Sequence, residues 1–144
     1  MENIFENLYV HWDLHTALLS SVCSKYHLTR TELLVLLFLK KHTSNTATDI
    51  VNQLKITKSH VSSSVRDLEE RGFVKSTFEG QNHRTIHLQL CDNASEIVKA
   101  VEGVQRKFIS ILCKSFTGEE KRALKRYVQR MTTNANEYLK NCRR

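Results

Sequence analysis

Hydroxyl groups and one guanidinium are concentrated in residues 57 to 66, TKSHVSSSVR. Three consecutive serines, Ser62 to Ser64, are unusual in a stretch with helical periodicity, because a serine hydroxyl competes for backbone hydrogen bonds. Small polar side chains let a helix approach another surface closely, and they can donate to or accept from base edges and phosphates. Two interpretations follow: a helix that reads the major groove of DNA, or an ordinary solvated polar face.

A helical wheel at about 100° per residue separates this segment into two faces. Val61, Val65 and Leu68 lie on the first, with Ser64 at its edge. The opposite face carries the predicted major-groove residues and their neighbours: Ser59, His60, Ser62, Ser63 and Arg66. No carboxylate follows until Asp67. At the start of the helix, Thr57 and Lys58 are predicted to contact the DNA backbone.

The stretch HWDLH places His11 and His15 one helical turn apart, on a series of apolar residues. Imidazoles at this spacing can bind a metal, titrate near neutral pH or hydrogen-bond an acidic ligand. They can equally be interface histidines satisfied by nearby carbonyls or carboxylates. Zinc requires three or four ligands, and no spacing in the chain announces the others. No metal site is therefore predicted.

The four cysteines are irregularly spaced and form no C-x-x-C pair, which indicates reduced thiols. Three are expected to pack as small apolar side chains, namely Cys23, Cys91 and Cys113, with Cys142 exposed. Lys25 would lower the pKa of Cys23 if both were exposed, so a redox-responsive regulator is an alternative.

Composition favours a polyanionic partner, since Lys and Arg outnumber Asp and Glu by 22 to 15, giving a net charge of +7. The chain shows no phosphate-binding glycine loop, nucleophile elbow or H-E-x-x-H motif, so neither an enzyme nor a cofactor is predicted. No apolar run reaches transmembrane length, and the N-terminus carries acids where a signal peptide carries bases. We expect a soluble, cytoplasmic protein.

Hydrophobic periodicity and capping signals predict the helices and strands that would position the candidate site residues. Helices are predicted over residues 4–25, from Thr29 onward as a buried helix, 47–54, 57–72, 93–115 and from 117 onward. Strands are predicted over 73–78 and 85–90, with a loop at 79–84. The predicted fold class is mainly α with a small β-hairpin wing (α+β), a winged helix-turn-helix.

With this element order, the chain resembles the MarR family of bacterial transcriptional regulators. The resemblance lies in the element order and in the stretch DLEERGFV, similar to the family's end of the recognition helix. The wing residues Asn82, His83 and Arg84 stand where the family has an acidic residue followed by two basic ones. Arg84 matches the arginine that reaches into the minor groove, and the resemblance implies that Asn82 and His83 accompany it at the DNA.

The resemblance also implies the assembly. A single domain over 1–144 is expected, with a DNA-binding part at 29–90 and dimerisation helices at 1–28 and 91–144. The apolar stripes of the terminal helices are too extensive for one chain to cover, which likewise favours a homodimer. Two recognition helices about 34 Å apart would bind a pseudo-palindromic operator, and a repressor is the expected role.

A regulator of this kind is expected to respond to a small molecule. In family members that bind aromatic or phenolic ligands, the pocket lies between the dimerisation helices and the winged domain. By position, the residues expected to line it are His11, Trp12, His15, Phe38 and Phe108. Besides a metal- or redox-responsive regulator using His11 and His15 or Cys23, the competing hypothesis is a winged-helix module that binds another protein without reading DNA.

Overall fold

The computed structural model describes the backbone of residues 4–42, 45–79 and 82–142, with the side chains of these residues other than 4, 5, 79 and 82–84. The elements follow in the order α1 (Ile4–Tyr26), α2 (Arg30–Lys41), α3 (Ala47–Leu54), α4 (Lys58–Glu70), β1 (Val74–Glu79), β2 (Asn82–Leu90), the 3-10 turn η1 (Asp92–Ala94), α5 (Ser95–Leu112) and α6 (Gly118–Cys142). This confirms the predicted fold class, a mainly helical chain with a β-hairpin.

The helices begin where the capping signals predicted. Three capping boxes form: Thr29 with Glu32, Thr46 with Asp49, and Thr117 with Glu120. In the last of these, hydrogen bonds from the backbone N–H and the hydroxyl of Thr117 lower the pKa of Glu120. Thr57 caps α4 by accepting a hydrogen bond from the backbone N–H of His60 at 3.4 Å. Each cap satisfies backbone donors that a helix start leaves unpaired.

Two residues with left-handed backbone conformation, Lys55 and Gly72, lie before and after α4. Lys55 adopts φ 56° between α3 and α4, which produces the tight turn of the helix-turn-helix. Gly72 adopts φ 71° after α4, a conformation that costs glycine little because it lacks a Cβ. The chain can therefore reverse at Gly72 and enter β1 at once, as predicted.

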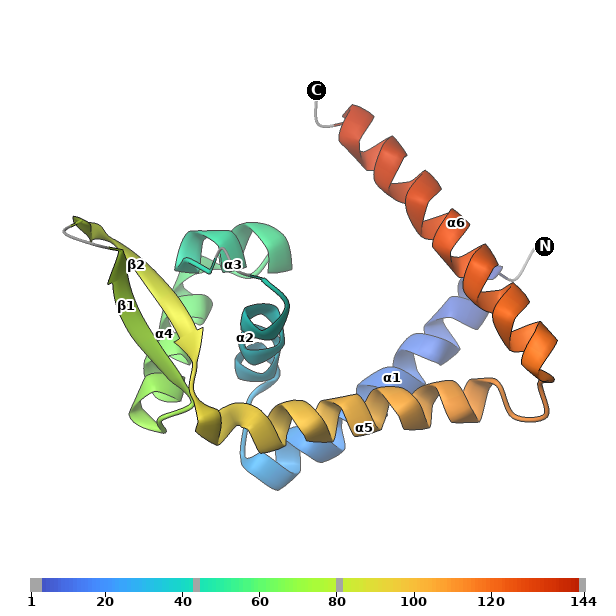
Figure 1. Cartoon of the computed structure of the whole chain (residues 1–144), viewed down its shortest axis with the longest axis horizontal. Coiled ribbons are helices and arrows are strands. Elements are labelled where there is room, and N and C mark those ends of the chain that lie inside the picture. Colours follow the sequence, from blue (N-terminus) through green and yellow to red (C-terminus); the bar gives the residue numbers. More distant parts are fainter. Residues whose placement is uncertain (1–3, 43–44, 80–81, 143–144) are drawn as a thin grey trace. The chain divides into compact units, whose positions relative to one another are not determined.

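The hydrophobic core surrounds α2, which packs against α4 and also contacts α1, α3 and β2 (Figure 1). Leu33, Val35 and Leu36 of α2 are 0 to 1% exposed. From α4, Val61 and Leu68 are fully buried on the side that packs against α2. The predicted apolar face of α4 is confirmed. The remaining well-buried core residues come from α1, α3, the hairpin and the first half of α5: Leu19, Val22, Ile50, Val74, Leu88, Ile97 and Val101.

The hairpin is longer than predicted. Strands β1 and β2 are antiparallel from Val74↔Leu90 to Phe78↔Ile86, and after an irregularity the pairing continues at Glu79↔Asn82. The predicted loop at 79–84 is wrong in its extent because backbone pairing carries β2 back to Asn82. Ile86 was expected on the inward face with Leu88, yet it is 49% exposed, since at that distance along the hairpin the core has ended.

Helix α4, and α5 (Ser95–Leu112) at both of its ends, also differ from the prediction. Helix α4 ends at Glu70 with Arg71 as its C-cap, before the expected Gly72. The long helix predicted over 93–115 is α5, and the 3-10 turn η1 at 92–94 takes up the chain between β2 and its first residue. Short 3-10 turns of this kind are common at helix starts because one backbone N–H can bond at closer spacing.

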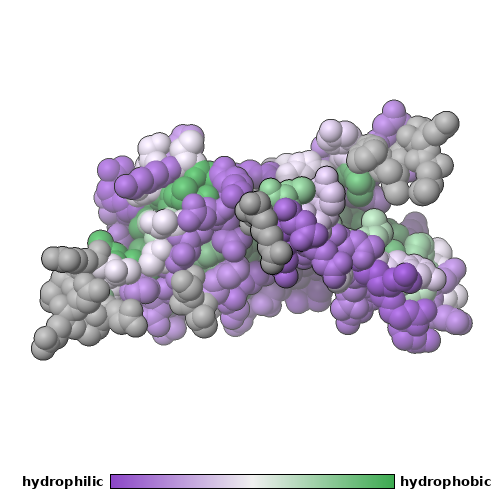
Figure 2. All heavy atoms as spheres, turned by 90° about the horizontal axis from the view of Figure 1, so that it is seen from above, coloured by the Kyte–Doolittle hydropathy of each residue, from purple (hydrophilic) through white to green (hydrophobic). Residues whose placement is uncertain are grey.

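The chain divides into two compact units, residues 1–108 and 109–144. The second contains α6, which buries none of its described residues. Its apolar stripe is exposed along the whole helix at Leu124, Val128, Met131 and Leu139. In the first unit, the N-terminal part of α1 is exposed in the same way. Hydrophobic side chains thus reach the surface at several places (green in Figure 2). No helix in the described ranges is long and apolar enough to cross a membrane.

All four cysteines are free: Cys113 is buried, Cys142 is exposed, and Cys23 and Cys91 are half-buried. Cys23 lines a small cavity of about 140 Å³ between α1 and α2. Burial raises the pKa of the Cys23 thiol, and the positive charge of Arg30 offsets this only in part. A raised pKa means less thiolate at neutral pH and lower reactivity.

We therefore expect Cys23 to be alkylated more slowly than Cys142. Limiting iodoacetamide at pH 7.5, followed by peptide mass spectrometry over time, measures the two rates in the same sample. Cys142 should be modified first, because Cys142 is exposed whereas burial shields Cys23 and raises the pKa of its thiol. Faster modification of Cys23 would contradict this and would support a redox-responsive site.

Candidate nucleic-acid interface

The N-terminal half of α4 presents an exposed polar surface, which starts at the N-cap residue Thr57. The Thr57 and Ser59 hydroxyls lie 3.2 Å apart and share a hydrogen bond. The outward residues that the wheel predicted are all exposed: Lys58, Ser59, His60, Ser62, Ser63 and Arg66. Ser64, predicted at the edge, is buried. The burial of one serine in three fits the helical period, since Ser64 follows Val61 and precedes Leu68 on the inner face.

Arg66 carries the longest side chain of this surface, and 69% of it is exposed. Its Nε lies 3.6 Å from Oδ1 of Asp67, an ion pair between two exposed groups. Exposed pairs of this kind contribute 0 to about 1 kcal/mol, so they hold a guanidinium only weakly. Arg66 is therefore available to another acceptor, such as a base edge or a phosphate.

Helix α4 is fixed to the hairpin as well as to α2. The hydroxyl of Ser76 in β1 donates a hydrogen bond to Glu69 Oε1. At the other edge of the hairpin, His87 Nδ1 lies 3.3 Å from Oδ1 of Asn45, which precedes α3. These contacts join α4 and the segment before α3 to the hairpin.

Asn82, His83 and Arg84 form the first residues of β2. Their side chains lie outside the described residues, so the predicted role of Arg84 in a minor groove stays a prediction. Their backbone is placed by the ladder that begins at Glu79↔Asn82. The predicted wing residues thus belong to the hairpin itself and not to a free loop.

The five residues predicted to line an effector pocket lie in different surroundings, and their role in ligand binding stays a prediction. His15 and Phe108 meet edge to face, with ring centroids 5.3 Å apart. Trp12 is exposed and lies under the guanidinium of Arg30 at 5.4 Å. Phe38 is buried in the core and stacks on His42. His11 is exposed. Core packing accounts for Phe38, because an aromatic ring on the apolar side of α2 has no polar group to draw it outward.

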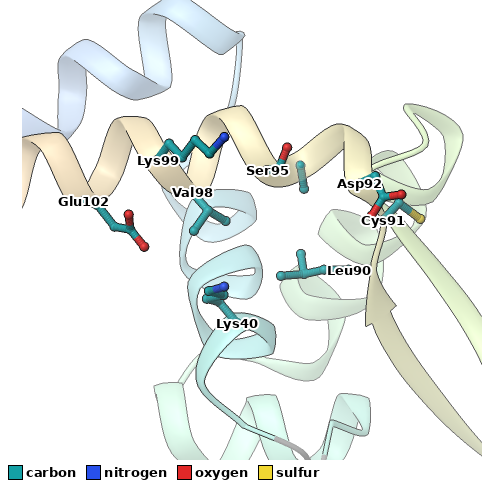
Figure 3. Close-up of a pocket in the computed structure, with 9 residues that line it drawn as sticks. Lys40, Leu90, Cys91, Asp92, Ser95, Val98, Lys99 and Glu102 are labelled. Carbon is teal, nitrogen blue, oxygen red and sulfur yellow. The ribbon is translucent and has the colours of Figure 1, made fainter.

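A cavity of about 280 Å³ lies between the end of α2, the end of β2 and the start of α5 (Figure 3). Leu90, Ala94 and Val98 supply apolar walls, and Lys40 and Lys99 supply ammonium groups. Its other lining residues are Cys91, Asp92, Ser95 and Glu102. This volume is near the lower end of small-molecule sites, which combine apolar walls with a few polar groups.

Sequence reasoning missed this cavity because its residues come from three separate elements. Lys40 lies at the last turn of α2, and the others follow the end of the wing. The one local signal was the run of polar residues between β2 and α5, CDNASE, at which the chain changes from strand to helix.

No group of three or more His, Cys, Asp or Glu side chains is placed to hold a metal ion within residues 4–42, 45–79 and 82–142. His15 instead contacts the Phe108 ring. The His11 and His15 pair is therefore not completed by further ligands in this part of the chain.

The fold is that of several solved structures. A MarR family protein from Bacillus stearothermophilus is similar with a TM-score of 0.77, 18% identity, and coverage of 92% of this chain and 93% of that one. A mutant of MepR from S. aureus, solved bound to an oligodeoxyribonucleotide, is similar with a TM-score of 0.65 and 18% identity. The match covers 94% of this chain and 98% of that one. BpsR from Bordetella bronchiseptica, whose DNA binding is regulated by 6-hydroxynicotinic acid, is similar with a TM-score of 0.65 and 15% identity. The match covers 90% of this chain and 98% of that one. No curated protein sequence matches the chain.

The sequence supports the same relationship as the fold. Residues 26–85 match the sequence model of the MarR family, a range that holds α2, the helix-turn-helix and most of the hairpin. Helices α1, α5 and α6, which flank this range, occur in the order shared with the MarR structures. By the sequence match over residues 26–85 and by its fold, the chain is similar to the MarR family, whose members are winged-helix transcription regulators.

Proposed function

We propose that the protein is a homodimeric transcriptional regulator that binds a pseudo-palindromic operator, acts as a repressor and is released by a small molecule. The observation that carries this proposal is the exposed half of α4. It combines small hydroxyls with Arg66 and Lys58, and it lacks a carboxylate before Asp67. Such a surface suits close approach to base edges, whereas a solvated face without a partner has no need to exclude acidic residues.

The roles proposed for the site follow from position along α4. Ser59, Ser62, Ser63 and Arg66 read the major groove, and His60 flanks them. Thr57 and Lys58, at the start of the helix, hold the DNA backbone, because a helix N-terminus and an ammonium group both favour phosphate. In the wing, Arg84 enters the minor groove, accompanied by Asn82 and His83.

Homodimerisation is proposed from the exposed apolar residues of the terminal helices. On α6, Val128 and Met131 are 51% and 59% exposed, and on α1 Val10 is 65% exposed. An apolar stripe that is exposed along a helix is normally covered by a partner. A second copy of the chain presents the same surface, so a two-fold dimer covers both at once. A repressor bound at an operator would then exclude other proteins from the same DNA.

The cavity beside Lys40 is the proposed effector site. The ammonium groups of Lys40 and Lys99 would pair with a ligand carboxylate in competition with Asp92 and Glu102 of the same lining. The walls formed by Leu90 and Val98 would hold an aromatic or aliphatic body. BpsR, whose DNA binding responds to 6-hydroxynicotinic acid, supports an acid of this class. Helix α2 lines the cavity through Lys40 and also packs against α4. A ligand in the cavity would therefore shift α2 and, through it, the position of α4.

The proposal is tested by binding to the DNA upstream of the protein's own gene. Fluorescence anisotropy across a salt series, with random duplex as competitor, should show saturable binding of one dimer per palindrome. We expect affinity tighter than for random DNA by about a thousandfold or more. Weak binding that is equal on all duplexes would contradict it and would favour the protein-binding winged-helix module.

Replacing Arg66 by Ala separates base reading from phosphate contact. We expect a loss of about 1 to 3 kcal/mol on the operator and little change on random DNA, if the guanidinium binds a base in bidentate fashion. Arg106→Ala on α5 removes the same charge from an exposed site and serves as the control. An equal loss on both duplexes would instead make Arg66 a phosphate contact.

Lys40→Gln tests the effector site. Titration of benzoate or 6-hydroxynicotinate into the protein–operator complex should release the unaltered protein. For Lys40→Gln, the ligand concentration that releases half of the operator should be about ten times higher or more, because a hydrogen bond to a charged group contributes about 1.5 to 3 kcal/mol. Lys41→Gln is the matched control, since Lys41 is an exposed neighbour that does not line the cavity. Identical behaviour of the two variants would exclude Lys40 from the site.

A further inference from the structure

Arg71 joins the recognition helix to the end of α1. It is the C-cap of α4, and its side chain donates to two backbone carbonyls 44 and 45 residues away in the chain. The Nη1 donates to His27 O at 2.9 Å and the Nη2 to Tyr26 O at 2.5 Å. Both carbonyls belong to the C-terminal end of α1, where helix carbonyls lack partners along the helix and a positive charge is favoured.

The guanidinium is also held by an aromatic ring. Its Cζ lies 4.8 Å from the centroid of Phe73, the residue that follows the turn at Gly72. The backbone N–H of Phe73 donates to Leu68 O at 2.9 Å, so the ring is itself fixed to the last turn of α4. Within the described part of the chain, no carboxylate lies within ion-pair distance of Arg71. The position of the Arg71 guanidinium is therefore fixed by two directional hydrogen bonds and by its contact with the Phe73 ring.

These bonds link the ends of two helices that each pack mainly against α2. Helix α4 packs mainly against α2, α3 and β1, and α1 packs against α2. Apolar packing of this kind is non-directional and allows small tilts. A planar guanidinium with two hydrogen bonds is directional, and lysine cannot reproduce its fork.

We propose that Arg71 is a positioning residue that sets which half-site spacing the dimer accepts, by fixing the tilt of α4 relative to α1. The inference rests on the proposed function, in which α1 is part of the dimer interface. Helix α4 has 13 residues and is about 20 Å long. A tilt of about 10° about its C-terminal end would move its N-terminal end by about 3.5 Å, close to the 3.4 Å rise of one base pair.

The experiment compares duplexes that differ only in spacing. A palindrome selected from random DNA by the unaltered protein is synthesised in its selected form and with one central base pair inserted or removed. Affinities for the three duplexes are measured for the unaltered protein, Arg71→Gln, Arg71→Lys and Lys25→Gln. Lys25 is the matched control, because its ammonium group lies over the Tyr26 ring at the same end of α1 and carries the same charge.

The unaltered protein should prefer the selected spacing by about tenfold or more. For Arg71→Gln and Arg71→Lys we expect that preference to fall at least threefold, with the slope of log K against log salt unchanged. Lys25→Gln should keep the preference. Thermal unfolding and sedimentation confirm that each variant folds and dimerises, and should Arg71→Gln fail to fold, Arg71→Lys decides the test.

Two results would overturn the inference. In the first, the spacing preference survives in both Arg71 variants. In the second, affinity falls equally on all three duplexes while the salt slope drops by about 0.9, which marks Arg71 as a phosphate contact. Both are distinct from failure of the proposed function, in which the unaltered protein discriminates among no duplexes; in that case Arg71 has no spacing to set and the inference falls with it.

Discussion

The packing of α4 against α2 is the interaction on which the rest of the structure depends. Val61 and Leu68 are fully buried there, against a helix whose own Leu36 is fully buried. Burying side chains of this size stabilises the fold by about 1.5 to 3 kcal/mol each. Because a helix has two faces at a period of 3.6 residues, fixing the apolar face inward turns the serine-rich face outward. The exposure of Ser63 and Arg66 is thus a consequence of core formation.

Apolar packing alone leaves the tilt of α4 loosely defined, and polar contacts at its C-terminal half supply the direction. Ser76 bonds Glu69 from the hairpin, and Arg71 bonds the end of α1. The N-terminal half has a different character: its cap at Thr57 is local, and its outer side chains are exposed. One end of the helix is therefore held by side-chain hydrogen bonds while the other presents exposed side chains, which suits the proposed contact with DNA.

Local signals in the sequence predicted most of the fold. The capping boxes at Thr29, Thr46 and Thr117 marked helix starts to within a residue, because a cap and the backbone that it satisfies are near neighbours in the chain. The extent of β2 was predicted wrongly, since strand pairing depends on a partner across the hairpin and not on the residues of one strand. The effector role expected from position in the family for His11, Trp12, His15, Phe38 and Phe108 stays a prediction; the structure shows Phe38 buried in the core and His15 against Phe108.

By itself, the sequence determined the helical periods, the caps, the positive charge and the two faces of α4, all of which follow from residues within a few turns of one another. Tertiary structure decided the cavity beside Lys40 and Val98, whose walls come from three elements, and the bonds of Arg71 to carbonyls 44 and 45 residues away. The physical reason is common to both. Long-range contacts depend on where the chain brings backbone and side chains together, and a backbone carbonyl carries no residue identity for a sequence pattern to reveal.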